Sequence, residues 1–165
     1  MTYLSLAFVF LGSIGCQYGL ILFFRRRALF QQIYELSPES HQKKAATPAL
    51  GGVGLLVMLW LGCLLVEFSP VVLWVVCADT AFACIGLYDD IAALVKGKNQ
   101  GLNTINKFLV QLVVAVGLVV WFSVVVQPLT VWMFLLAVVA FVGASNATNL
   151  TDGLDGLLGC NAIIS

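Results

Sequence analysis

Long apolar stretches alternate with short polar segments along the whole chain. The apolar stretches cover about residues 3–24, 48–66, 71–88, 108–126 and 130–145. About 20 apolar residues in a helix cross the roughly 30 Å hydrocarbon core of a bilayer. The pattern therefore predicts an all-α, polytopic membrane helix bundle with five complete transmembrane helices. A sixth apolar segment begins after residue 156, so we expect one integral-membrane domain over residues 1–165, truncated at its C-terminus.

Composition supports this class of protein. Hydrophobic residues make up 61% of the chain and charged residues 10%, and the mean hydropathy is +1.03. Such a chain is too apolar for a soluble domain of this size, so we expect a lipid bilayer as its surroundings. The eight basic and eight acidic residues cancel to a net charge of zero. Arg25–Arg27 could suggest nucleic-acid or lipid binding, but at the boundary of a span a topology signal is favoured, so we expect no nucleic-acid partner.

The positions of the charges predict the topology. The basic residues fall in three clusters, namely Arg25–Arg27, Lys43 with Lys44, and Lys96, Lys98 and Lys107. Loops rich in lysine and arginine face the cytoplasm, and the first cluster follows the first apolar stretch. We expect the N-terminus outside, cytoplasmic loops at about 25–47, 89–107 and 146–156, and external turns at Glu67 and Gln127. The expected location is a bacterial plasma (inner) membrane.

A polar stretch of unusual spacing follows the fifth apolar segment. Asn146, Asn149, Asp152 and Asp155 stand three residues apart, a spacing that places neighbours on one side of a helix. Gly153 and Gly156 add no side chain between the acids, which suits a close approach by a ligand. The simpler interpretation is a polar loop between spans, and the regular spacing favours a binding site.

Acidic residues near the third apolar segment are the next candidates. Asp89 and Asp90 follow it directly, and two acids at a helix C-terminus oppose the helix dipole. Their position indicates a compensating cation or ligand, although acids at a span boundary are often only solvated surface. Asp79 lies within the segment, where a charge is unfavourable. We expect it to be protonated or hydrogen-bonded inside the bundle, or to make a packing contact.

Two lysines lie next to expected helix starts, and Lys44 is a candidate phosphate ligand by its position. Lys44 precedes Thr47-Pro48, which is a favourable pair for starting the second helix at Pro48. Free N–H groups at such a helix start attract anions. Lys107 is expected in the first turn of the fourth helix, where the dipole disfavours a cation. The alternative for Lys44 is a topology signal.

Three segments resemble signatures of the phospho-MurNAc-pentapeptide transferases, a branch of the polyprenyl-phosphate sugar-1-phosphate transferases. They are Asn146-Ala-Thr-Asn149-Leu-Thr-Asp152-Gly-Leu-Asp155-Gly156-Leu, Ser40-His41-x-x-Lys44-x-x-Thr47-Pro48-x-x-Gly51-Gly52, and Ile85-Gly-Leu-Tyr-Asp89-Asp90 with a lysine loop ending at Lys107. The chain departs from the family pattern at Thr148, Ala46 and Ala49. Ala49 replaces a threonine, which removes an expected hydroxyl contact.

The resemblance implies transfer of phospho-MurNAc-pentapeptide from UDP-MurNAc-pentapeptide to undecaprenyl phosphate, giving lipid I and UMP with Mg²⁺ as cofactor. It implies Asp89 as general base and Asp90 as a residue that positions metal or substrate, both being metal ligands with a further ligand expected beyond residue 165. The substrate-binding residues would be Lys44, Lys107, Asn146, Asn149, Asp152 and Asp155. We expect these groups around one pocket at the cytoplasmic surface. A homodimer is compatible with this picture.

Three alternatives stay open. Another polyprenyl-phosphate transferase could use a UDP-N-acetylhexosamine as donor. A transporter subunit is disfavoured, because only Asp79 is ionisable deep within a span. The third alternative is a fragment without activity, since the family's later membrane acid and histidine-rich loop are absent from these residues.

Overall fold

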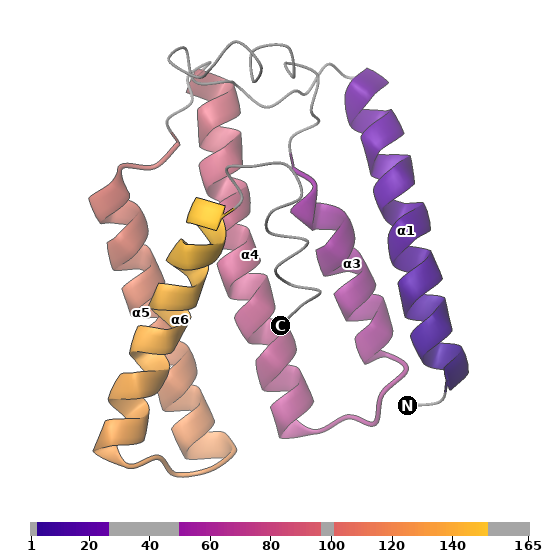
Figure 1. The fold of residues 1–165 in the computed structure, drawn as a ribbon. Helices are drawn as coiled ribbons and strands as arrows, with labels where there is room; N and C mark the ends of the chain where they lie inside the picture. The colour runs from indigo at the N-terminus through magenta and orange to yellow at the C-terminus, as the bar shows by residue number, and fades with distance from the viewer. Residues whose placement is uncertain (1–2, 27–49, 97–100, 152–165) are drawn as a thin grey trace. The chain divides into compact units, whose positions relative to one another are not determined.

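The protein is helical throughout the part that the computed structural model describes, residues 3–26, 50–96 and 101–151. The helices in these ranges are α1 (Tyr3–Arg26), α3 (Gly52–Cys63), α4 (Pro70–Lys96), α5 (Thr104–Val125) and α6 (Val131–Thr151) (Figure 1). Four of them, α1, α4, α5 and α6, are long and apolar enough to cross a membrane. The prediction of a polytopic membrane helix bundle is confirmed.

The chain divides into two compact units, Met1–Lys107 and Phe108–Ser165. The first unit holds α1, α3, α4 and the first turn of α5. The second holds the remainder of α5 and α6. Each unit is described by itself below.

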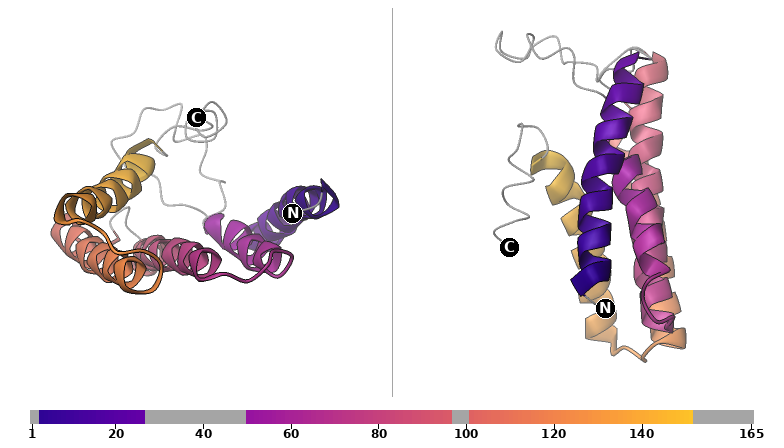
Figure 2. Two further views of the ribbon diagram at one scale, coloured as in Figure 1. Left: turned by 90° about the horizontal axis from the view of Figure 1, so that it is seen from below. Right: turned by 90° about the vertical axis from the view of Figure 1, so that its right-hand side faces the viewer.

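In the first unit, α3 lies between α1 and α4 and runs antiparallel to both (Figures 1 and 2). Glycines allow α1 and α3 to pack closely. A Cβ on Gly54 would lie 2.8 Å from Leu20 Cδ1, and a Cβ on Gly62 would lie 3.2 Å from Val9 Cγ2. Small residues at such contacts let membrane helices approach, because lipid provides no hydrophobic force between them.

Helix α3 is shorter than the predicted second span. It has 12 residues, which at 1.5 Å per residue reach only about 18 Å. The predicted start at Pro48 is wrong, because Leu50 has a φ of 66° and lies outside the helical region. Gly51 is the N-cap and has no side-chain cap, while Gln17 Nε2 of α1 donates to the Gly51 carbonyl at 3.0 Å. Among the described residues, α3 is thus an apolar helix shorter than the predicted span over residues 48–66, and the number of membrane spans stays a prediction.

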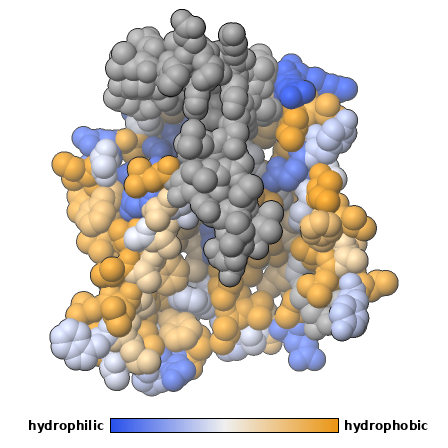
Figure 3. All heavy atoms as spheres, in the orientation of Figure 1, coloured by the Kyte–Doolittle hydropathy of each residue, from blue (hydrophilic) through white to orange (hydrophobic). Residues whose placement is uncertain are grey.

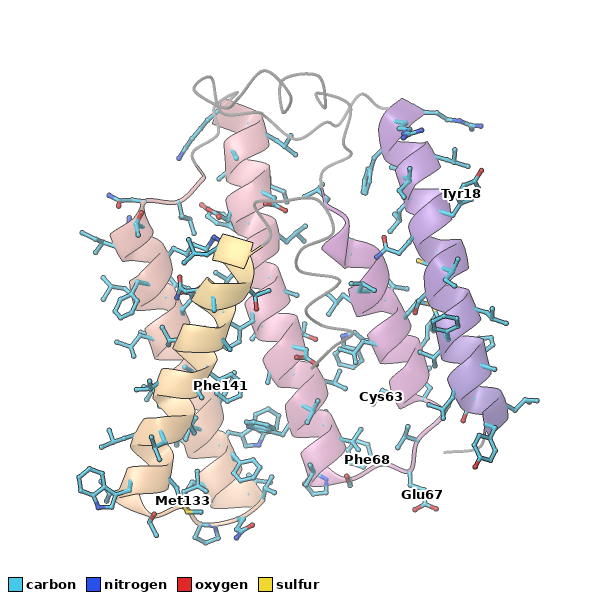
Figure 4. All side chains as sticks on the ribbon, in the orientation of Figure 1. Tyr18, Cys63, Glu67, Phe68, Met133 and Phe141 are labelled. Atoms are coloured by element: carbon cyan, nitrogen blue, oxygen red, sulfur yellow. The ribbon has the colours of Figure 1, made fainter. Side chains whose placement is uncertain are left out.

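Helix α4 begins at Pro70, directly after Ser69, which caps it. Ser69 Oγ accepts from Val72 N–H at 3.2 Å, and Pro70 takes the first helical position. The preceding turn carries Glu67 and Phe68 (Figure 4), as predicted for a turn without basic residues. Trp60 Nε1 of α3 donates to Thr80 Oγ1 of α4 at 3.0 Å, which joins the two helices.

Helix α4 differs from the prediction at its C-terminal end. The helix does not end at Tyr88 but continues to Lys96, so Asp89 and Asp90 lie within it rather than in a loop over residues 89–107. Residues 91–95 are good or tolerated helix formers, and Lys96 in the last turn suits the dipole. The side chain of Asp79 is exposed, and no hydrogen bond or ion pair joins it to another described residue. Of the alternatives expected for Asp79, a hydrogen bond is therefore not seen among the described residues, while the protonated state stays a prediction.

In the second unit, α5 and α6 lie side by side and antiparallel (Figure 2). Residues 126–130 connect them, and two hydroxyls hold this turn. Ser123 Oγ accepts from Leu129 N–H at 3.1 Å, and Thr130 Oγ1 accepts from Met133 N–H at 3.4 Å. The buried core of the unit includes Ala115, Leu118, Val119, Val138 and Val142.

Helix α6 also extends further than predicted. It includes Asn146 and Asn149 and continues to Thr151, where a loop was expected from residue 146. Most large apolar side chains of the described helices are exposed on their flanks (orange in Figure 3), as expected for helices surrounded by lipid.

Candidate functional site

An ion pair joins the end of α4 to the start of α5. Lys107 Nζ lies 2.7 Å from Asp89 Oδ2, and the two side chains are 14% and 21% exposed. The second carboxylate oxygen, Oδ1, accepts from the backbone N–H of Leu102 at 2.6 Å. Asp89 thus uses both oxygens within the protein. The prediction of Lys107 in the first turn of its helix is confirmed, and Asp89 compensates a cation that the dipole disfavours.

Gly101 fits tightly against the same carboxylate. A Cβ at this position would overlap Asp89 Oδ1 and the Asp89 carbonyl oxygen. Lys96 Nζ donates to the Gly101 carbonyl at 2.7 Å. Asn103 Oδ1 accepts from Ile105 N–H at 3.3 Å and caps α5. The backbone before α5 is therefore fixed by side chains from both helices.

Asp90 faces another direction from Asp89. Consecutive residues on a helix point about 100° apart, so the two carboxylates do not share one face. Asp90 is exposed, whereas Asp89 is half-buried against Lys107 and Leu102. The two acids, which the sequence presents as a pair, occupy different environments.

Asp89 and Asp90 alone offer too few ligands for magnesium, so substrate phosphates and water would have to complete the site. No group of three or more His, Cys, Asp or Glu side chains that could hold a metal occurs in the described ranges. Magnesium is commonly held by one or two carboxylates together with substrate phosphates and water. The exposed carboxylate of Asp90 fits this donor set, and Asp89 would have to share lone pairs that already accept two hydrogen bonds.

A polar cluster joins α5 and α6 in the second unit. Gln111 is 1% exposed. Its Nε2 donates to Ser145 Oγ at 2.9 Å, and its Oε1 accepts from Asn146 Nδ2 at 2.8 Å. Asn146 Nδ2 also donates to the Val142 carbonyl at 2.8 Å. The amide N–H groups of Asn146 are thus engaged within the protein.

Asn149 lies one turn further along α6. Its side chain is exposed, and its spacing from Asn146 places both residues on the same side of the helix, as the sequence predicted. Lys44, Asp152 and Asp155 lie outside the described residues. Of the predicted site residues, the structure therefore brings Asp89 and Lys107 into contact and pairs Asn146 with a residue that was not predicted.

Sequence reasoning missed Gln111, Gly101 and Leu102. Gln111 is the one carboxamide inside the fourth apolar stretch, and a polar side chain within a membrane span is a signal for a specific partner. Gly101 lies in the loop that carries the lysines, where a glycine is common and indicates no specific contact. The backbone N–H of Leu102 carries no sequence signal, because every residue except proline has one.

Comparison with known proteins gives a family. The Glycosyl transferase family 4 model matches residues 71–165, the range that contains Asp89, Asp90, Lys107 and the asparagines of α6.

Several similar proteins are named phospho-N-acetylmuramoyl-pentapeptide-transferase. The relative from Desulfosudis oleivorans is 39% identical over 157 residues, covering 85% of this chain and 44% of the relative. That from Halalkalibacterium halodurans is 39% identical over 156 residues, covering 84% and 48%. The one from Geobacillus thermodenitrificans is 33% identical over 183 residues, covering 98% and 56%. The chain spans about half the length of these relatives, and it belongs to glycosyl transferase family 4.

Proposed function

We propose that the chain takes part in transferring phospho-MurNAc-pentapeptide from UDP-MurNAc-pentapeptide to undecaprenyl phosphate. The products are lipid I and UMP. The relatives named phospho-N-acetylmuramoyl-pentapeptide-transferase support this reaction. The observation that carries the proposal is the contact between Asp89 and Lys107, the acid and the last lysine of the third signature segment, which meet where α4 and α5 adjoin.

The reaction needs charge neutralisation and alignment more than covalent chemistry. An oxygen of the lipid phosphate attacks the phosphorus attached to the sugar. A new P–O bond forms, the P–O bond to UMP breaks, and the leaving UMP takes the electron pair. Magnesium, when bound with the substrate, would neutralise the diphosphate charge, and Asp90 is its candidate ligand.

The remaining residues have binding roles in this proposal. Lys107 supplies a positive charge for a substrate phosphate, and its ammonium group is a hydrogen-bond donor. Asn149 is exposed and can hydrogen-bond the nucleotide or the sugar. Lys44, Asp152 and Asp155 are further candidate substrate ligands by family resemblance. Asn146 contributes by fixing the end of α6, because its amide N–H groups bind Gln111 and Val142.

We further propose that the site faces the cytoplasm across a bacterial inner membrane. Within the first unit, Arg25 and Arg26 end α1 and Lys96 ends α4, and these two helix ends lie at the same side of the unit (Figure 1). Asp89 lies near this end of α4. Glu67 lies in the turn at the opposite end. Basic residues are enriched on the cytoplasmic side of membrane proteins, which supports this orientation.

A transfer assay with two donors tests the reaction. The chain, and a chimera in which residues 1–165 are continued by the matching C-terminal part of the Desulfosudis oleivorans relative, are placed in membranes with undecaprenyl phosphate and Mg²⁺. We expect lipid product from UDP-MurNAc-pentapeptide and none from UDP-N-acetylglucosamine. Product from the second donor alone would assign the chain to another polyprenyl-phosphate transferase.

A further inference from the structure

Contacts at Asp89 fix a piece of backbone as well as a side chain. Its Oδ1 holds the N–H of Leu102, its Oδ2 holds Lys107, and Gly101 has no room for a side chain beside it. Lys96 holds the Gly101 carbonyl from the same helix. These contacts all serve to hold the segment that leads into α5 against the last turns of α4.

The orientation of Lys107 depends on this arrangement. A lysine side chain has about four rotatable bonds and loses much conformational entropy when it is held in one place. Near a helix N-terminus its charge is also disfavoured. The carboxylate of Asp89 offsets both effects at 2.7 Å, and Lys107 remains 14% exposed. The ion pair therefore holds the Lys107 side chain in one orientation, with a small part of that side chain still exposed.

We propose that Asp89 is a positioning residue, which fastens the Gly101–Leu102 backbone and aims Lys107 at a substrate phosphate, while the exposed Asp90 holds the phosphate-bound cation. These roles of Asp89 and Asp90 rest on the proposed phosphoryl transfer. The positioning role of Asp89 replaces its role as general base, since both of its oxygens already accept hydrogen bonds. A phosphate monoester has a second pKa near 6, so most of the nucleophile is already a dianion at neutral pH and gains little from a base.

The fastening is tested without any activity measurement. Amide hydrogen exchange of the segment containing Leu102 is measured for the chain in lipid nanodiscs, comparing Asp89→Ala and Gly101→Ala with wild type. Loss of a hydrogen bond to a charged acceptor should speed exchange by about tenfold or more. Gly117→Ala is the matched control, because a Cβ at Gly117 meets nothing within 4 Å. Unchanged exchange in both Asp89→Ala and Gly101→Ala would overturn the proposal.

The aiming of Lys107 is tested by a double-mutant cycle in the transfer assay, using Asp89→Asn, Lys107→Met and the double variant. If Asp89 acts through Lys107, each single variant loses activity about 10- to 100-fold, and the double variant loses no more than Lys107→Met alone. The loss in Asp89→Asn should be the same at pH 7 and pH 9. If the losses of the two single variants multiply in the double variant, or if the activity of Asp89→Asn recovers at high pH, Asp89 acts independently of Lys107, as a base.

The tests separate this proposal from the proposed function. If wild type transfers nothing but Leu102 exchange still responds to Asp89→Ala and Gly101→Ala, the fastening stands and the transfer reaction fails. If transfer is present and Gly101→Ala is as active as Gly117→Ala, the positioning role fails and the reaction stands.

Discussion

Replacing Gln111 by leucine should weaken the pairing of α5 with α6. Gln111 is 1% exposed and makes one hydrogen bond to Ser145 and one to Asn146, both across the helix pair. Leucine has a similar volume, so the substitution removes the polar contacts without opening a large cavity. It also leaves the apolar neighbours Ala115, Leu118 and Val119 in place.

The size of the effect follows from the bonds that are lost. Hydrogen bonds between membrane helices contribute about 0.6 kcal/mol each on average, with a maximum of about 1.7. Two bonds give about 1.2 kcal/mol, and up to about 3 kcal/mol if both are strong. Asn146 keeps its bond to the Val142 carbonyl, which favours the lower value. Leucine gains little in return, since lipid tails are as apolar as the helix interface.

Unfolding in mixed micelles measures this difference. The wild-type chain and the Gln111→Leu variant are titrated with a denaturing detergent, and helix unfolding is followed by circular dichroism. Gln127→Leu makes the same chemical change at an exposed residue of the connecting turn and serves as control. The reasoning is refuted if Gln111→Leu is as stable as wild type, or if Gln127→Leu is destabilised equally.

Three further results are expected. Gly54→Leu should loosen the α1–α3 contact, because even a Cβ there lies 2.8 Å from Leu20 Cδ1, whereas Gly15→Leu, with open space around it, should leave intramolecular cross-linking of the two helices unchanged. Ser69→Ala removes the N-cap of α4 and should lower the free energy of unfolding by about 1 kcal/mol, measured in the same detergent titration. Asp90→Asn should raise the Mg²⁺ concentration for half-maximal transfer by about tenfold or more, and an unchanged requirement would remove Asp90 from the metal site.

Hydropathy predicted most of the fold, because membrane helices must satisfy their backbone hydrogen bonds internally and so follow the apolar stretches. The helix ends were less predictable. Residues 91–95 read as the start of a loop, yet α4 continues through them to Lys96. In the second stretch, apolar composition indicated a full span, but Leu50 leaves the helical region and α3 begins only at Gly52.

The sequence predicted which residues belong to the candidate site. It did not predict which of them contact one another. Resemblance selected Asp89, Asp90 and Lys107, but the pairing of Asp89 with Lys107 joins residues from two helices and follows no helical period. The adjacent acids suggested a joint metal site, whereas a rotation of about 100° per residue directs them apart. Gln111 escaped notice because hydropathy averages over a window, and a single carboxamide barely changes that average.

The proposed transfer is tested most directly by its reverse, the exchange of UMP into the nucleotide sugar. Labelled UMP is incubated with UDP-MurNAc-pentapeptide, undecaprenyl phosphate and Mg²⁺ in membranes that contain the chain or the chimera. Label should enter the nucleotide sugar only with Mg²⁺ present, and Lys107→Met should greatly reduce its incorporation. Absence of incorporation with both the chain and the chimera, in membranes where the Desulfosudis oleivorans relative is active, would contradict the account.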